Sequence, residues 1–394
     1  MITFSNQPKL RFNEFTTDWN VVPLGNWIVE RKEKSKIQDQ HEILTSSRHG
    51  LIKQTDYYDG NERISARDNI GFHVICPEEL TYRSRSDDRR FYFNINSLDV
   101  KGIISSYYPV FNLEGADSYF FTQVCKVHSF YVGSRSVGTS QTVLSINELK
   151  KIKLPFPAYE EQKKISLFLK KVDLRLNLIK DKLSLLEQYK KGVIQKLFKK
   201  EIRFKDDNGG YFPDWQEEKL GKYLEEYKEK STEENQHEVL TSSRTGLMKQ
   251  SDYYGEGRIT ERSNKGFNVI PSGYLTYRSR SDDRQFFFNL NELGFAGIIS
   301  TYYPVFKMKN DQNRFFVELS RFHKNRFGRQ AVGTSQVVLS FNELKNIKLP
   351  IPCTEEQKKI AAFSHELDKK ICSVKEQIEL TKAYKKGLLQ QMFV

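Results

Sequence analysis

The sequence has little cysteine: four residues in 394, none in a CxxC pair and none near a histidine at the spacing of a zinc site. We therefore expect no metal site and interpret Cys76, Cys125, Cys353 and Cys372 as thiols of a reducing compartment. No stretch approaches 18 consecutive apolar residues, and residues 1–15 lack the apolar core of a secretory signal peptide. These absences predict a cytoplasmic protein.

Motifs that carry catalysis are also missing. The chain has no GxGxxG or NPPY-type motif, which binding of S-adenosylmethionine and methylation of a base would require. It has no GxxxxGK[ST] motif of an ATP-driven motor, and no nucleophile elbow assembles its serine, histidine and aspartate residues. We expect this chain to have no catalytic residue and no cofactor, so that any catalysis must come from other chains.

Basic residues are plentiful. Lysine and arginine number 63 against 50 aspartate and glutamate residues, which gives a formal net charge of +13. A nucleic acid fits this balance, because each cation placed near a phosphate releases a condensed counterion. A basic protein without a polyanionic partner has the same composition, so charge favours nucleic acid without deciding the question.

The chain repeats itself once. Four segments return in the same order: 41–58 as 237–254, 81–96 as 276–291, 102–111 as 297–306, and 137–157 as 332–352. The offset is 195 or 196 residues throughout, about half of the chain. This pattern indicates a tandem duplication of one whole unit, since it is too long for a solenoid repeat.

Each repeat combines a globular part with a long helix. The predicted fold is α+β, with two mixed α/β globular domains at residues 1–157 and 201–353 and spacer helices at residues 158–200 and 354–394. Strand candidates of the first domain are runs of β-branched and aromatic residues at 72–76, 90–95 and 107–111.

The helical stretch after Pro157 has no further proline up to residue 200, and its apolar residues recur at alternating steps of four and three with one break at Lys190. This heptad spacing predicts a helix of about 40 residues, roughly 60 Å long. The stretch from Glu355 repeats the pattern. Because a lone helix would expose such a seam to water, we expect the two helices to pair with each other. Packing of each helix on its own domain is the alternative.

Short motifs recur in the same order in both repeats. They are Trp19 and Trp215, Leu24-Gly25 and Leu220-Gly221, GTSQ at 138–141 and 333–336, and then LSxNELKxIKLPxP followed by EEQKKI. With these motifs, essentially the whole chain resembles the specificity (S) subunit of a type I restriction–modification system.

The resemblance implies that each globular domain is a target recognition domain, which reads one half of a split site in double-stranded DNA. It implies an antiparallel coiled coil that separates the two domains with pseudo-two-fold symmetry. It also implies two methyltransferase subunits and, in a restriction complex, two restriction subunits as partners, with no membrane involved. S-adenosylmethionine and ATP would then bind those partner subunits.

The chain departs from the family pattern in one respect. The two recognition domains of family members are usually dissimilar, whereas here they nearly match. Matching domains on an approximate two-fold axis should read matching half-sites on opposite strands. We therefore expect a bipartite, palindromic recognition sequence. The alternative from another class is a non-enzymatic basic adaptor that binds RNA or acidic proteins.

The leading candidate for DNA contact is segment 81–89, which returns unchanged at 276–284. It has no apolar side chain to anchor it in a core; arginine can pair with guanine and aspartate can accept from cytosine. A solvated loop tied by internal arginine–aspartate pairs is the alternative. The residues expected to contact DNA are Tyr82, Arg83, Ser84, Arg85, Ser86, Asp87 and Arg89, with Tyr277, Arg278, Ser279, Arg280, Ser281, Asp282 and Arg284.

Two shorter segments are further candidates. Small hydroxyls beside an arginine suit phosphate oxygens, although they also cap helices: Ser46, Ser47 and Arg48, with Ser242, Ser243 and Arg244. The GTSQ motif could present backbone N–H groups and a glutamine amide to DNA or form a structural turn: Thr139, Ser140 and Gln141, with Thr334, Ser335 and Gln336.

Other recurring residues have weaker claims. We interpret Tyr107-Tyr108 and Tyr302-Tyr303 as packing residues, and His128 and His323 as hydrogen-bonded structural histidines. Additional phosphate contacts are expected from Lys53, Lys249, Arg63, Arg258, Arg67 and Arg262.

Overall fold

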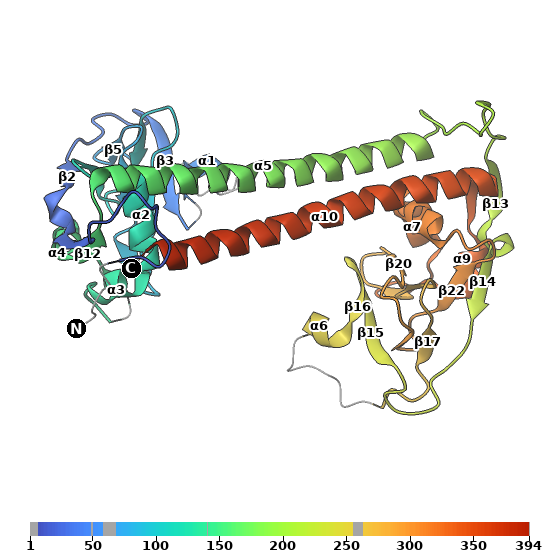
Figure 1. Ribbon diagram of the computed structural model, residues 1–394. Coiled ribbons are helices and arrows are strands. Elements are labelled where there is room, and N and C mark those ends of the chain that lie inside the picture. The colour runs from blue at the N-terminus through green and yellow to red at the C-terminus, as the bar shows by residue number, and fades with distance from the viewer. Residues whose placement is uncertain (1–6, 49, 58–67, 140, 255–262, 394) are drawn as a thin grey trace. The chain divides into compact units, whose positions relative to one another are not determined.

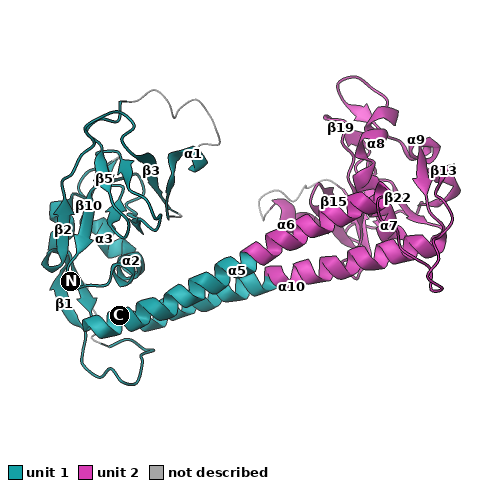
Figure 2. Ribbon diagram, turned by 90° about the horizontal axis from the view of Figure 1, so that it is seen from above, with its two compact units in different colours: residues 1–180, 376–394 teal, residues 181–375 magenta. Residues whose placement is uncertain are grey.

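The computed structural model describes residues 7–48, 50–57, 68–139, 141–254 and 263–393. The chain forms two compact units: unit 1 comprises residues 1–180 and 376–394, and unit 2 comprises residues 181–375 (Figure 2). Each unit contains one globular head, meaning its part outside the two long helices, together with a segment of both helices. The sequence predicts four consecutive segments, in which each long helix is a separate part. In the structure each helix is instead divided between the two units.

The head of unit 1 is built from short strands and helices. Its strands are β1 (Asn20–Pro23), β2 (Ile28–Arg31), β3 (Glu42–Ser47), β4 (Gly50–Lys53), β5 (His73–Ile75), β6 (Leu80–Tyr82), β7 (Arg85–Ser86), β8 (Phe93–Ile95), β9 (Gly102–Ile104), β10 (Val110–Leu113), β11 (Thr142–Val143) and β12 (Lys153–Phe156). Its helices are η1 (Leu24–Asn26), α1 (Gln54–Tyr57), α2 (Ser118–Val127), α3 (Ser129–Ser134) and α4 (Ile146–Lys151), and the long helix α5 (Tyr159–Phe198) follows.

The head of unit 2 repeats these elements in order. Its strands are β13 (Gln216–Lys219), β14 (Leu224–Tyr227), β15 (Glu238–Ser243), β16 (Gly246–Lys249), β17 (Asn268–Ile270), β18 (Leu275–Tyr277), β19 (Arg280–Ser281), β20 (Phe288–Leu290), β21 (Gly297–Ile299), β22 (Val305–Met308), β23 (Val337–Val338) and β24 (Lys348–Ile351). Its helices are η3 (Leu220–Lys222), α6 (Gln250–Tyr254), α7 (Asn313–Phe322), α8 (Lys324–Gln330) and α9 (Phe341–Asn346), and the long helix α10 (Thr354–Met392) follows.

Strand pairing is the same in both heads. Unit 1 has two four-stranded sheets, β2-β10-β6-β8 and β4-β3-β9-β5, and two ribbons, β1-β12 and β7-β11. Unit 2 has the corresponding sheets in the same order. The β3–β9 and β15–β21 pairs are parallel, and the other strand pairs are antiparallel. The predicted α+β class is confirmed.

The LSxNELKxIKLPxP motif forms a capped helix followed by a strand. The Ser145 hydroxyl accepts the N–H of Glu148 and thereby caps the start of α4, as Ser340 does for α9 with Glu343. After α4 the chain enters β12, which pairs with β1 in a register that places Asn20 opposite Phe156. The end of the head is therefore fastened to its first strand just before α5 begins.

The EEQKKI motif joins each head to the helix that follows it. In unit 1 the Glu161 carboxylate is buried and accepts two hydrogen bonds from Arg11, at 2.8 and 2.7 Å, and one from Trp19 Nε1 at 3.3 Å. The hydrogen bonds from Arg11 to Glu161 raise the pKa of the guanidinium. Gln162 Nε2 donates to the carbonyl oxygen of Pro157 at 2.9 Å. The motif therefore fixes the angle at which α5 leaves the head.

Unit 2 contains the same junction. Glu356 is 1% exposed and accepts from Arg203 Nη2 at 2.8 Å and from Trp215 Nε1 at 2.9 Å. Gln357 Nε2 donates to Pro352 at 2.9 Å. Because a bidentate arginine–carboxylate pair has fixed geometry, both helices start from their heads in the same way.

The last turn of each long helix completes the core of a head. In unit 1, Phe393 near the end of α10 packs against Trp19 and Phe120, with ring centroids 6.2 and 5.2 Å away. In unit 2, Phe198 at the end of α5 packs against Trp215 and Phe315, at 5.7 and 5.9 Å. Each unit therefore needs the end of one long helix and the start of the other.

Helices α5 and α10 pack together within each unit, as Figure 1 also shows. In unit 1, Ile165 and Leu169 near the start of α5 share a core with Leu388 and Met392 near the end of α10, so the two segments are antiparallel. The predicted pairing of the helices is confirmed. The described helices, α5 and α10 included, are too short or too polar for a membrane crossing.

Partly buried charges accompany this pairing at the heptad break that the sequence shows. Lys190 of α5 binds Asp368 of α10 at 2.7 Å and Glu318 of α7 at 3.0 Å in unit 2. In unit 1 the corresponding Lys385 of α10 binds Asp173 of α5, which also accepts from Tyr119. In unit 2 the lysine comes from α5 and the aspartate from α10, whereas in unit 1 the lysine comes from α10 and the aspartate from α5.

Removal of the buried carboxylate at the junction should destabilise its unit. Glu356→Ala leaves the Trp215 indole without its acceptor and leaves Arg203 with only the exposed Asp214 and two backbone carbonyls. Breaking such a buried pair costs about 3–5 kcal/mol. We expect the free energy of unfolding of unit 2 to fall by about 3 kcal/mol, measured by chemical denaturation. The exposed neighbour provides the control, Glu355→Ala. A loss below about 1 kcal/mol would contradict the role given to Glu356.

His323 should make the stability of unit 2 depend on pH. Burial, together with the nearby cation of Arg326, lowers the pKa of His323 to about 4, and within the described residues its Nε2 has no hydrogen-bond partner. The hydrogen bond expected of a structural histidine is therefore missing at Nε2. The unfolded chain binds a proton at about pH 6.5 and the folded chain only near pH 4, so this contribution to stability is complete above pH 6.5 and falls as the pH decreases towards 4.

His323→Phe should remove this pH dependence while keeping the aromatic contact with Phe322, whose centroid lies 4.8 Å away. We expect the wild-type chain to lose about 1 kcal/mol more than the variant between pH 7 and pH 5, after allowance for solvent screening. Denaturation of both proteins at the two pH values measures the difference, and parallel profiles would refute the prediction.

Candidate nucleic-acid interface

Segment 81–89 is divided between the core and the surface. Tyr82, in β6, is fully buried, and its hydroxyl donates to the carbonyl oxygen of Leu144 at 2.9 Å; Tyr277 makes the same bond to Leu339. Burial raises the pKa of both phenols. This corrects the prediction that these two tyrosines contact DNA, since they present no side-chain surface to a ligand.

The Ser86 hydroxyl is buried and stabilises a turn. Its Oγ donates to the Asp88 carboxylate at 2.8 Å and accepts the N–H of Arg90 at 3.0 Å, and the residue is 8% exposed. Ser281 makes the equivalent bonds to Asp283 and Gln285. The predicted DNA contact is corrected for both serines: their hydroxyls shape the loop that carries the neighbouring arginines.

Ser84 fixes the chain between two exposed arginines, Arg83 and Arg85. Its N–H and its hydroxyl both donate to the carbonyl oxygen of Tyr107, at 2.9 and 2.8 Å, and its own carbonyl accepts from the N–H of Leu144. In unit 2, Ser279 holds Tyr302 in the same way, at 3.0 and 2.7 Å. The hydroxyl is therefore committed to the fold, and the flanking side chains point outward.

Arg85 lies against an aromatic ring. Its guanidinium carbon is 4.2 Å from the centroid of Tyr107, and Arg280 is 4.2 Å from Tyr302. The two tyrosines are 49% and 51% exposed, which corrects their interpretation as packing residues. A cation stacked on an exposed ring keeps the N–H groups at its edge available while its orientation is restricted.

Arg48 occupies the tip of the β3–β4 hairpin. It forms an ion pair with Asp88 at 3.1 Å and lies 5.6 Å from the centroid of Tyr92. The Ser46 hydroxyl accepts from Asn94 at 2.7 Å, and the Ser47 hydroxyl donates within the hairpin to the carbonyl oxygen of Gly50. Of the three residues predicted here, the arginine is the exposed one.

Unit 2 reproduces this hairpin. Arg244 pairs with Asp283 at 2.5 Å and lies 5.4 Å from the centroid of Phe287. The Ser242 hydroxyl accepts from Asn289 at 2.7 Å, and Ser243 donates to the carbonyl oxygen of Gly246.

The aspartates beside these arginines stay ionised at neutral pH. The Ser86 hydroxyl, followed by the N–H of Arg90 and the charge of Arg48, holds the pKa of Asp88 below its usual range. The Ser281 hydroxyl, the N–H of Gln285 and Arg244 do the same for Asp283. Because the ion pairs are exposed, each contributes little to stability and can be exchanged for a phosphate at small cost.

The GTSQ motif lies beside the same loop. Gln141 Nε2 donates to Asp87 at 3.2 Å, and Arg89 Nη2 donates to the carbonyl oxygen of Gly138 at 3.3 Å. Gly138 has φ of +122°, and a Cβ there would lie 2.5 Å from the Gln141 carbonyl oxygen, so the turn requires glycine.

The second GTSQ motif makes matching contacts. Gln336 bonds to Asp282 at 3.1 Å, and Arg284 bonds to the carbonyl oxygen of Gly333 at 3.1 Å. Thr139, Thr334 and Ser335 are exposed, whereas Ser140 lies outside the described residues.

These residues form what we call the arginine face of each unit: Arg48, Arg83, Arg85, Asp87, Arg89 and Gln141 in unit 1, and Arg244, Arg278, Arg280, Asp282, Arg284 and Gln336 in unit 2. In unit 1 a cavity of about 260 Å³ is lined by Arg48, Arg83 and Arg85, with Arg90 as a further cation. The sequence prediction missed Tyr107 and Tyr302 as supports, although their unchanged return in both repeats was a signal.

Two of the six predicted phosphate contacts are lysines that form ion pairs within the protein. Lys53 pairs with Glu42 at 3.3 Å, and Lys249 pairs with Glu238 at 3.4 Å. The remaining four predicted phosphate contacts lie outside the described residues: Arg63, Arg67, Arg258 and Arg262.

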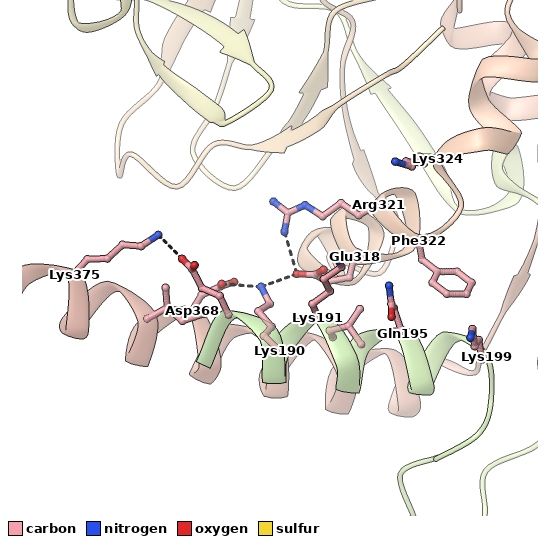
Figure 3. A pocket seen from close by; sticks show the side chains of 13 residues that line it. Lys190, Lys191, Gln195, Lys199, Glu318, Arg321, Phe322, Lys324, Asp368 and Lys375 are labelled. Carbon is pink, nitrogen blue, oxygen red and sulfur yellow. Dashed lines mark hydrogen bonds and ion pairs between the residues drawn. The ribbon is translucent and has the colours of Figure 1, made fainter. Parts of the chain in front are cut away.

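A larger cavity, of about 630 Å³, lies in unit 2 between α7 and the two long helices (Figure 3). Its central charges neutralise one another: Lys190 bridges Glu318 and Asp368, and Arg321 binds Glu318 at 3.3 Å. Burial opposes ionisation of Glu318, but Arg321 and Lys190 lower its pKa below the usual value. The lining also carries Lys191, Lys199 and Lys324.

Comparisons with known proteins point to one family. The family described as "Type I restriction modification DNA specificity domain" matches residues 91–188 and 199–382. The chain is 26% identical to the type I restriction enzyme MjaVIII specificity subunit of Methanocaldococcus jannaschii, over 94% of this chain and 91% of that protein. It is 28% identical to the putative MjaX specificity subunit of the same organism, over 65% and 61% of the two chains.

Solved structures share the fold. The S subunit of a type I restriction–modification system from M. genitalium aligns with a TM-score of 0.59 at 16% identity, over 98% of this chain and 99% of that chain. A chain from a structural study of complex assembly and conformational transition of the type I R-M system aligns with a TM-score of 0.50 at 16% identity, over 95% and 96%. Since the family match covers more than half of the sequence, the chain belongs to the type I restriction–modification DNA specificity family.

Proposed function

We propose that this specificity subunit reads a bipartite, palindromic DNA site, one half with each arginine face, on behalf of a methyltransferase that binds to it. The observation that carries the proposal is the agreement of the two faces contact by contact. The arginine–tyrosine stack measures 4.2 Å in both units, and the glutamine–aspartate bond measures 3.2 and 3.1 Å. Equal faces should recognise equal half-sites.

The differences near the faces are few. Arg90 is replaced by Gln285 and Tyr92 by Phe287, whereas the six residues of each arginine face are the same. The same lysine–aspartate contact forms in both units with α5 and α10 interchanged. This interchange supports an inverted repeat of the half-sites rather than a direct repeat.

The chemistry of the face suits both kinds of DNA contact. A guanidinium such as that of Arg85 can donate two bonds to O6 and N7 of guanine, and Asp87 can accept from N4 of cytosine. Arg48, at a hairpin tip and in a weak ion pair, suits a phosphate oxygen. We assign base reading to Arg83 and Arg85 with their counterparts, and phosphate binding to Arg48 and Arg244.

Catalysis is assigned to partner subunits. The chain lacks the motifs that bind S-adenosylmethionine or ATP, so both cofactors would bind elsewhere in the complex. We propose that the chain is a non-catalytic scaffold in the cytoplasm for two methyltransferase subunits and, where restriction occurs, two restriction subunits. A basic adaptor for RNA or acidic proteins would show no preference among duplex sequences, so selection from random DNA separates the two functions.

Arg85→Ala and Arg280→Ala should each relax one half-site. Loss of a bidentate base contact costs about 1–3 kcal/mol, so the preference for the base that this arginine reads should fall roughly 5- to 150-fold. The measurement is selection of bound duplexes from a random pool by the specificity subunit with its methyltransferase. Mirror-image relaxation by the two variants is expected. Uniform weakening across all sequences would reassign both arginines to phosphate contacts.

Asp88→Asn should increase affinity for DNA of any sequence. The amide oxygen can still accept from Ser86, but the competing charge beside Arg48 is removed. One more effective phosphate contact should steepen the slope of log K against log salt by about 0.9. DNA binding measured at salt concentrations between roughly 50 and 200 mM gives this slope. The control is Asp56→Asn, on the surface helix α1. An unchanged slope would place Arg48 away from the phosphates.

A further inference from the structure

Two valines lie in line with Arg85 on the surface of unit 1. Val143 of β11 is directly opposite Arg85 of β7, and Val137 is opposite Val143 in an isolated antiparallel bridge. Two backbone hydrogen bonds, of 2.9 and 2.8 Å, join Val137 and Val143. Because opposite residues of antiparallel strands share a face, the three side chains lie side by side at steps of roughly 5 Å. We call Val137 and Val143 the valine row of unit 1.

The valine row points away from the core. Val137 is 69% exposed and Val143 is 39% exposed, whereas Thr142 and Ser86, the next pair along the same two strands, are buried. The alternation of a strand therefore directs Thr142 and Ser86 inward and the valines outward. One exposed valine is ordinary on a protein surface, but two in line beside an exposed arginine form an apolar surface that the core does not use.

Unit 2 repeats this arrangement. Val338 is opposite Arg280, and Val332 is opposite Val338, with exposures of 38 and 66%. The inward residue next to the row differs between the units, since Thr142 is replaced by Val337. The outward valines are the same, so the surface of the row agrees more closely than the core behind it.

Cations surround the valine row, which favours DNA as the partner. Arg85, at one end, is exposed and stacks on Tyr107, and Arg89 donates to the carbonyl oxygen of Gly138, the residue after Val137. DNA phosphates suit such cations, and the apolar group that a base pair presents in the major groove is the C5-methyl group of thymine. Duplex DNA with a thymine at the valines therefore matches both the charge and the apolar part of this surface.

We infer that the valine row reads a thymine, whose C5-methyl group packs against Val137 or Val143. The row extends roughly 10 Å from Arg85, and base pairs follow one another every 3.4 Å or so along the duplex. The thymine therefore lies within about three base pairs of the guanine that Arg85 reads. The valines of unit 2 do the same beside Arg280. The inference rests on the proposed function and adds an A·T pair to each half-site.

The first experiment removes the methyl group from the DNA. Selection from random duplexes gives the half-site, and the base preference that Arg85→Ala relaxes identifies the guanine. Deoxyuridine, which lacks only the C5-methyl group, then replaces each thymine in turn. At one thymine within about three base pairs of that guanine, it should weaken binding by the specificity subunit with its methyltransferase roughly fourfold. Replacement in both half-sites should weaken binding roughly 16-fold.

The second experiment removes the valines. The variant Val137→Ser/Val143→Ser/Val332→Ser/Val338→Ser should bind the thymine site more weakly than the wild type and show no further loss with deoxyuridine. Val29→Ser, 44% exposed in β2 and outside the row, is the matched control and should keep the full response to deoxyuridine. Thermal denaturation checks that each variant is folded, and the deoxyuridine series on the wild-type chain does not depend on any variant.

The outcomes separate the inference from the proposed function. If selection recovers no preferred duplex sequence, the proposed function fails. If a site is recovered but Arg85→Ala relaxes no guanine, or no thymine near it responds to deoxyuridine, the inference is overturned and the recognition of a bipartite site stands. If the serine variant loses methyltransferase binding but still responds to deoxyuridine, the valines contact protein instead of DNA, which also overturns the inference.

Discussion

Each head completes its core with the end of a long helix that begins in the other unit. Phe393 fills this place against Trp19, and Phe198 fills it against Trp215. At the same junction Glu161 or Glu356 is buried against an arginine and the tryptophan indole, so the start of one helix and the end of the other meet at each head. Neither head has its full core without both helices.

This constraint explains which parts of the two repeats agree. Junction residues and the arginine face match because each unit needs the same core and, in the function proposed here, the same half-site. The exposed loop positions that differ, such as Arg90 and Gln285, lie outside both sets. The outer sides of α5 and α10 have diverged further, since neither core depends on Leu174 or Lys369.

The repeat, the heptad helices and the α+β class could be predicted because they follow from the spacing of residues along the sequence. Which side chains of segment 81–89 and its neighbours are buried and which are exposed could not be predicted. Strand β6 turns Tyr82 inward, and the next residue, Arg83, is exposed, which a polar segment does not reveal. The support of Arg85 by Tyr107 joins residues 22 positions apart, and the pair of Arg48 with Asp88 joins residues 40 positions apart. Contacts between loops of this kind require the tertiary fold.

In the function proposed here, two equal faces read two equal, inverted half-sites. Single-molecule methylation sequencing of DNA from cells with and without this gene tests it most directly. We expect one gene-dependent methylated motif, made of two identical half-sites in inverted orientation around a spacer whose bases are not recognised. A motif with unrelated halves, or methylation that does not change when the gene is removed, would contradict it.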